Sequence, residues 1–113
     1  MLIAADIGNT NIVIGFFKGG DFLFSRRLHT GPPQSVDEYE MLLRGMLFAY
    51  NRDLDTAESG VVASVVPELT GVFIELLKRI TGQKPLIVDH ALKLGIQTVS
   101  YTHLRAHEPR HAV

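Results

Sequence analysis

LIAADIGNTN, residues 2–11, decides the fold of this chain. A short apolar run, Leu2–Ala5, ends there in a carboxylate, a glycine and the small polar residues Asn9–Asn11, which add neutral hydrogen-bonding groups. Gly8 has no Cβ, so the backbone can turn tightly and its N–H groups can approach an anion closely. Asp6 cannot bind a phosphate directly, because both are anionic. We therefore expect Asp6 to hold a Mg²⁺ ion, or a water on one, that bridges to the phosphates.

A hairpin turn without any ligand explains the same residues. Gly-Asn is common turn chemistry, and the apolar run Ile12–Phe17 that follows predicts a second strand. Two interpretations therefore stand: a turn that only connects two strands, and a turn that also binds phosphate. The local pattern alone favours the first, and the second gains weight from the whole string Asp6–Asn11.

The composition is that of an ordinary globular domain. The 113 residues are 46% apolar and 20% charged, with a net charge of −1, so nothing indicates a nucleic-acid or membrane-surface partner. No apolar run approaches the roughly 20 residues of a membrane span, and the N-terminus lacks the basic region of a signal peptide. The absence of cysteine excludes disulfides and thiolate metal sites and fits a reducing compartment. We expect a cytoplasmic protein.

Apolar periodicity and turn signals predict the element order βββαβαβ. Short turns separate the first strands, so an antiparallel meander is expected. Ser35 and Glu38 form a capping-box pair that begins the first helix, and Pro67 and Gly82 are suited to the start and end of the second. The expected strands are Leu2–Ala5, Ile12–Phe17, Phe22–Leu28, Gly60–Val66 (buried on both faces) and Pro85–Val88, with a polar linker over Asn51–Ser59.

Helical spacing predicts one apolar face on each helix. The face of the first helix is expected to contain Val36, Tyr39, Leu42, Leu43, Met46, Leu47 and Tyr50. That of the second is expected to contain Leu69, Val72, Phe73, Leu76, Leu77 and Ile80.

The last residues, 99–113, differ in character from the rest. They hold three of the five histidines, His103, His107 and His111, whose spacing would place three imidazoles on one helix face, as in a metal site. A solvated tail explains them better. A third interpretation is better still, because the DNA string TCTTATACACATCTCCGAGCCCACGAG, which resembles a transposase sequencing adapter, encodes Ser100–Glu108 in order. We expect residues 99–113 to be a non-native tail.

The string Asp6–Asn11 resembles the first phosphate loop of the actin/hexokinase/Hsp70-type ATPases. The predicted element order is similar to the ribonuclease-H-like domain of that superfamily. The resemblance implies an α/β fold, with helices on a mixed sheet and the first strand at its centre. Asp6 would then lie at the carboxyl end of that strand, the usual ligand edge of such a sheet.

More narrowly, residues 1 to about 97 resemble the type III pantothenate kinases. The phosphate loop has the family's form Asp-x-Gly-Asn-Thr-Asn, and Asp37-Glu38-Tyr39 is like its Asp-Glu-Tyr. Val61–Pro67 resembles the strand that ends in Ser-Val-Val-Pro, and Lys93–Ile96 resembles a Lys-Thr-Gly-Leu/Ile stretch. The order and spacing of these matches are more specific than any one of them.

The resemblance implies a homodimeric enzyme that phosphorylates pantothenate with ATP, the first step of coenzyme A synthesis. It also implies Mg²⁺ and a monovalent cation, K⁺ or NH₄⁺, as cofactors. Asp6 would bind the metal. The residues implied to contact ATP and its phosphates are Asp6, Ile7, Gly8, Asn9, Thr10, Asn11, Ile12 and Val13.

The family's catalytic aspartate lies in a Gly-Ala-Asp-Arg motif, and its second phosphate loop reads Asp-Phe-Gly-Thr; this sequence contains neither. Tyr101 lacks the Asn-Pro that follows the family's pantothenate-binding tyrosine, so we give it no substrate role. We expect residues 1–98 to be the N-terminal domain of an incomplete enzyme, with no catalytic residue and no activity of its own. The alternatives are a non-catalytic transcriptional accessory regulator of the same family and another actin-like ATPase.

Overall fold

The computed structural model describes residues 1–88. The adapter-like segment Ser100–Glu108, the three tail histidines, Tyr101 and the Lys93–Ile96 motif lie outside the described residues. The predicted boundary between residues 98 and 99 lies outside them as well.

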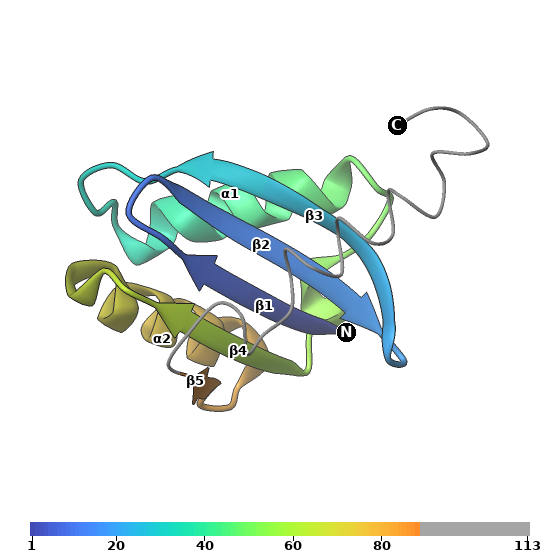
Figure 1. Cartoon of the computed structure of the whole chain (residues 1–113). Coiled ribbons are helices and arrows are strands. Elements are labelled where there is room, and N and C mark those ends of the chain that lie inside the picture. Colours follow the sequence, from blue (N-terminus) through green and yellow to red (C-terminus); the bar gives the residue numbers. More distant parts are fainter. Residues whose placement is uncertain (89–113) are drawn as a thin grey trace, which may run out of the picture.

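One five-stranded sheet, with two helices on one of its faces, forms the described part of the chain (Figure 1). The strand order is β3-β2-β1-β4-β5, so the first strand is central, as predicted. β1 pairs antiparallel with β2 and parallel with β4, which makes the sheet mixed. The elements are β1 Leu2–Ile7, β2 Asn11–Lys18, β3 Asp21–His29, α1 Val36–Phe48, the 3₁₀ turn η1 Leu54–Thr56, β4 Ser59–Ser64, α2 Pro67–Thr81 and β5 Leu86–Val88.

The first strand is longer than predicted. It continues through Asp6 and Ile7 instead of ending at Ala5. The reason is pairing on both sides, since Asp6 lies opposite Val13 of β2 and opposite Ala63 of β4. A strand with a partner on each side keeps its ladder hydrogen bonds across a charged residue, although a carboxylate is unfavourable for strands by propensity.

The main core lies between the sheet and the two helices. Alternate residues of β1, Ile3, Ala5 and Ile7, point into it, and the intervening Leu2 and Ala4 belong to a smaller cluster on the opposite face. Both helices lie behind the sheet in the view of Figure 1. Within residues 1–88, no helix is long and apolar enough to span a membrane.

The predicted capping box is confirmed. The Ser35 Oγ accepts from the Glu38 backbone N–H at 3.2 Å, and the Glu38 carboxylate accepts from the Ser35 backbone N–H at 2.9 Å. These bonds favour the charged carboxylate, so the pKa of Glu38 is lowered, chiefly by the backbone bond and then by the hydroxyl.

The predicted apolar face of α1 is confirmed in part. Tyr39, Leu43 and Leu47 are buried, but Leu42, at the middle of the helix, is exposed. Tyr50 lies beyond the helix, because Asn51 takes a left-handed conformation (φ 54°) that reverses the chain. There the Tyr50 ring stacks on Phe24 of β3, with centroids 3.8 Å apart.

The expected polar linker Asn51–Ser59 is partly wrong. It contains the 3₁₀ turn η1, whose Leu54 is buried in the main core, and Ser59 already belongs to β4. β4 ends at Ser64, two positions before the predicted end, and Val65 is half exposed. A single buried leucine among polar residues gives no periodicity, which is why sequence analysis missed the turn.

The second helix begins and ends as predicted. Pro67 occupies its first turn, and Gly82 ends it in the left-handed conformation (φ 77°). Leu69, Phe73 and the pair Leu76-Leu77 are fully buried. The Arg79 guanidinium of α2 donates to Asp37 of α1, and this bond raises the pKa of Arg79.

Candidate phosphate-binding site

The turn between β1 and β2 lies at the carboxyl end of the central strand. Gly8 and Asn11 close it, and the exposed Asn9 and Thr10 form its tip. The Gly8 N–H donates to the Asn11 carbonyl oxygen at 2.9 Å, so this N–H serves the turn itself. Within residues 1–88, no acceptor receives the N–H groups of Asn9 and Thr10. These two backbone donors at the tip are available to an anion.

The glycine in this turn is needed for space. Its φ is not left-handed, but a Cβ at position 8 would lie 3.3 Å from the Asn11 carbonyl oxygen. A side chain would therefore push Asn11 away and open the turn. The turn is tight at Gly8, as predicted, and the close neighbour there is the Asn11 carbonyl oxygen. The approach of an anion stays a prediction.

Thr30, which directly follows β3, holds the turn from one side. Its hydroxyl donates to the Gly8 carbonyl oxygen and its N–H donates to the Thr10 carbonyl oxygen, both at 2.8 Å. Sequence analysis missed this residue. The signal was indirect: the antiparallel register places His29 opposite Asn11, which puts Thr30 opposite Thr10.

The segment after β4 holds the other side of β1. The Val65 N–H donates to the Ile7 carbonyl oxygen at 3.0 Å, one residue before the turn. Ser64 shapes that segment, because its hydroxyl accepts from the Val66 N–H at 3.0 Å. The turn is thus bonded to β3 and to the β4–α2 connection.

Asp6 lies two residues before the turn and is only 3% exposed. It is the one buried charged side chain among residues 1–88. Alternation along β1 places it on the face of Ala4, opposite the helices. Its place two residues before the turn puts a carboxylate close to the tip donors.

The donor set around Asp6 fits Mg²⁺ held together with a nucleotide. Residues 1–88 contain no cluster of three or more His, Cys, Asp or Glu side chains that could hold a metal without help. Mg²⁺ is commonly bound through one or two carboxylates, waters and substrate phosphates. One buried carboxylate beside a turn whose tip N–H groups have no acceptor among residues 1–88 fits such a set.

The other predicted ATP contacts fall into two groups. Ile7 and Ile12 are fully buried and belong to the main core, so only their backbone can contact a ligand. Val13 is buried on the opposite face, next to Asp6 in the pairing. The structure therefore brings Asp6, the turn tip and the Val13 backbone together at one edge.

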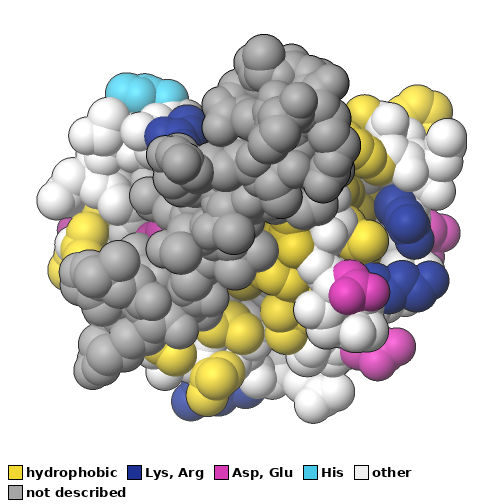
Figure 2. All heavy atoms as spheres, turned by 45° about the vertical axis from the view of Figure 1, so that its right-hand side comes forward, with side chains coloured by type: hydrophobic (Ala, Val, Ile, Leu, Met, Phe, Trp, Pro, Cys, Tyr) yellow, Lys and Arg dark blue, Asp and Glu magenta, His cyan; other side chains and the backbone are white. Residues whose placement is uncertain are grey.

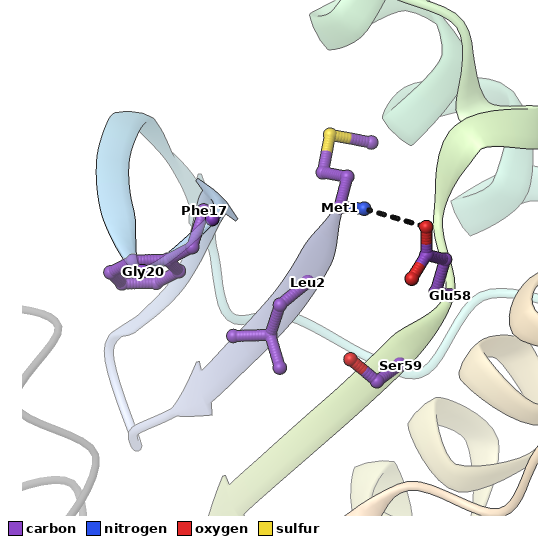
Figure 3. Close-up of a pocket in the computed structure, with 7 residues that line it drawn as sticks. Met1, Leu2, Phe17, Gly20, Glu58 and Ser59 are labelled. Carbon is purple, nitrogen blue, oxygen red and sulfur yellow. Dashed lines mark ion pairs between the residues drawn. The ribbon is translucent and has the colours of Figure 1, made fainter.

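A pocket at the opposite end of the sheet has no comparable chemistry (Figure 3). It is lined by Met1, Leu2, Phe17, Gly19, Gly20, Glu58 and Ser59. The Met1 amino group donates to the Thr56 carbonyl oxygen at 3.0 Å and lies 3.9 Å from the exposed Glu58 carboxylate. These contacts fix the chain terminus, and Asp6 lies at the other end of β1.

Comparison with solved structures supports the fold. The ethanolamine utilization protein EutJ from Carboxydothermus hydrogenoformans superposes with a TM-score of 0.52 at 16% identity, over 87% of this chain and 47% of that one. The described residues have the predicted α/β fold of the ribonuclease-H-like type, a mixed sheet with helices.

Comparison of sequences identifies the family. The type III pantothenate kinase family model matches residues 2–105. Type III pantothenate kinases of Moorella thermoacetica and Finegoldia magna are each 38% identical over 96 residues, or 85% of this chain. The match spans 38% and 37% of the length of those relatives. The chain belongs to the type III pantothenate kinase family.

Proposed function

We propose that this chain is the ATP-binding N-terminal part of an enzyme that phosphorylates pantothenate to 4′-phosphopantothenate, the first step of coenzyme A synthesis. The observation that carries the proposal is the β1–β2 turn. Two backbone N–H groups without an acceptor in the described part of the chain lie at its tip, and a buried carboxylate lies just below it. Family membership supports the choice of pantothenate as the acceptor.

The residues of the turn act by positioning charge. The N–H groups of Asn9 and Thr10 donate to phosphate oxygens of ATP, with their side chains as further donors. The backbone of Asp6–Val13 surrounds the phosphates, and Asp6 holds Mg²⁺. The metal neutralises charge on the phosphates when bound, which phosphoryl transfer requires.

The groups that complete the reaction are proposed to lie outside this domain. Residues 1–98 form the domain that binds the phosphates, and residues 99–113 are a non-native tail. The general base and the second phosphate loop belong to sequence that this chain does not contain. The short span of the match to the relatives supports this division. The monovalent cation, K⁺ or NH₄⁺, and a cytoplasmic location are part of the same proposal.

The complete enzyme is proposed to be a homodimer. Large apolar side chains that remain exposed on the described domain support an association surface, above all Phe48 (82% exposed) and Met41 on α1. Figure 2 shows further apolar side chains in the middle of the face that it presents. An exposed apolar surface of this kind is typical of a contact with another domain or subunit.

The test is an activity assay on the complete coding sequence, extended beyond the tail to the length of the relatives. Incubation with ATP, Mg²⁺ and pantothenate should give 4′-phosphopantothenate, detected by mass spectrometry. The 113-residue chain should give none. ATP consumption that does not depend on pantothenate would contradict the proposed acceptor. Asp6→Asn should abolish the product, and Asp21→Asn, at the exposed start of β3, is its control.

A further inference from the structure

We infer that Thr30 is the positioning residue that orients the backbone of the β1–β2 turn toward phosphate. The inference rests on the proposed function, since it assigns a role within the same site. Its starting point is that Thr30 bonds both Gly8, before the tip, and Thr10, in it, as no other residue outside the turn does among residues 1–88. The hydroxyl donates to the Gly8 carbonyl oxygen and the N–H donates to the Thr10 carbonyl oxygen, each at 2.8 Å.

The hydroxyl bond replaces one that ordinarily closes a hairpin. In a two-residue turn the residue after the tip usually donates its N–H to the carbonyl oxygen of the residue before it. Among the bonds of the described residues, Asn11 makes no such bond to Gly8. The Gly8 carbonyl oxygen accepts from the Thr30 hydroxyl instead, so the Asn11 N–H is released from this bond.

Peptide geometry converts these bonds into a direction for the donors. In a trans peptide the C=O and the following N–H point in opposite directions, and no cis peptide occurs among residues 1–88. With the Gly8 oxygen held toward Thr30, the Asn9 N–H points away from Thr30. The same holds for the Thr10 oxygen and the Asn11 N–H. Thr30 therefore holds two carbonyl oxygens on its own side of the turn. It directs the N–H of Asn9, one of the two proposed phosphate donors, and the N–H of Asn11 to the opposite side, where we place the phosphate.

The experiment compares Thr30→Val, which keeps the shape and removes the hydroxyl, with Thr30→Ser, which keeps the hydroxyl. Thr81→Val is the matched control. Its hydroxyl also donates to a backbone carbonyl oxygen (that of Leu77, at 2.7 Å), but it lies at the far end of α2. Two properties of the ¹⁵N-labelled chain are measured by NMR. They are the hydrogen exchange rate of the Gly8 amide without ligand and the affinity for Mg²⁺-ATP.

We expect Thr30→Val to speed exchange at Gly8 about fivefold and to weaken Mg²⁺-ATP binding by a similar factor, as the loss of one neutral hydrogen bond would. Thr30→Ser should restore both properties toward the wild-type values. Thr81→Val should change neither at the turn, although it destabilises the domain.

Two different results would overturn parts of the account. If Thr30→Val leaves Gly8 exchange and ATP affinity unchanged, or if Thr81→Val changes them equally, Thr30 has no positioning role. If the exchange pattern appears as expected but ATP shifts no amide of the turn in the wild type, the proposed nucleotide site is wrong. In that case Thr30 only stabilises a hairpin, and the inference fails together with the site.

Discussion

The two hairpin turns of the sheet look alike in sequence and differ in construction. The β2–β3 turn, Gly19-Gly20, has φ values of 59° and 85°, the left-handed pair that a type I′ turn requires. The β1–β2 turn has no residue with a left-handed φ between Gly8 and Asn11. A Cβ on Gly19 or Gly20 would contact nothing within 4 Å, whereas one on Gly8 would press on the Asn11 carbonyl oxygen.

The difference bears on the two interpretations that the sequence left open. The β2–β3 turn uses glycine for its backbone conformation, which is all that a connection between twisted strands needs. The β1–β2 turn has glycine because a Cβ there would press on the Asn11 carbonyl oxygen. Thr30 provides bonds that a simple connection does not need. It also has a buried carboxylate two residues before it. The predictions below compare the two turns directly.

The largest effect is expected from the two aspartates. Asp6→Asn should weaken Mg²⁺-dependent ATP binding roughly 10- to 100-fold, because interactions of a charged group are worth about 1.5–3 kcal/mol. Asp21→Asn, next to the β2–β3 turn, should leave binding unchanged. Calorimetric titration measures both, and equal losses in the two variants would remove the distinction between the turns.

A smaller effect is expected from the two glycines, and it should fall on stability in one variant and on ATP binding in the other. Gly20→Ala should lower the free energy of unfolding by about 1–2 kcal/mol, because alanine is strained at a left-handed φ, and it should leave ATP binding intact. Gly8→Ala should weaken ATP binding about fivefold, because overpacking of about 1 kcal/mol displaces Asn11. Gly8→Ala should lower the free energy of unfolding less than Gly20→Ala does. Urea denaturation and ATP titration of both variants test this opposite pattern. Loss of ATP binding in Gly20→Ala alone would reverse the comparison.

The smallest effect concerns the capping box that follows Thr30 along the chain. Because the pKa of Glu38 is lowered in the folded state, its carboxylate stabilises α1 above pH 4.5, the ordinary value. This stabilisation is lost as the pH falls through the lower folded value. Glu38→Gln should therefore melt slightly below the wild type at pH 7 and equally at strongly acid pH. A difference in melting temperature that grows as the pH falls would contradict the predicted direction. A change in ATP affinity would mean that the capping box belongs to the site.

Much of the fold was predictable because the local sequence signals for helix ends and turns agree with the way the strands pair. The capping box at Ser35, the proline at the start of α2 and the glycine at its end act within one helical turn, and all are confirmed. The central place of β1 followed from the element order and from the resemblance of the string Asp6–Asn11. The failures lie where distant contacts decide: Asp6 stays in a strand because of neighbours on both sides, and Tyr50 leaves the helix to stack on Phe24.

The residues of the candidate site were named from the sequence, and their role stays a prediction; the bonds that shape the turn could not be predicted. Sequence alone indicated the carboxylate and the polar tip. It could not show that the Gly8 N–H donates to the Asn11 carbonyl oxygen, nor that Thr30 bonds the turn. Both facts depend on the register between strands. The buried side chains of Ile7 and Ile12 were included in the predicted loop as a continuous stretch, although alternation directs them into the core.

The most direct measurement is an NMR titration of the ¹⁵N-labelled chain with ATP, with and without Mg²⁺. If the β1–β2 turn binds the phosphates, the amide signals of Asn9 and Thr10 should shift to saturation and respond to Mg²⁺. Those of Gly19 and Gly20 should stay in place. Unmoved Asn9 and Thr10 signals, or equal shifts at both turns, would contradict the account.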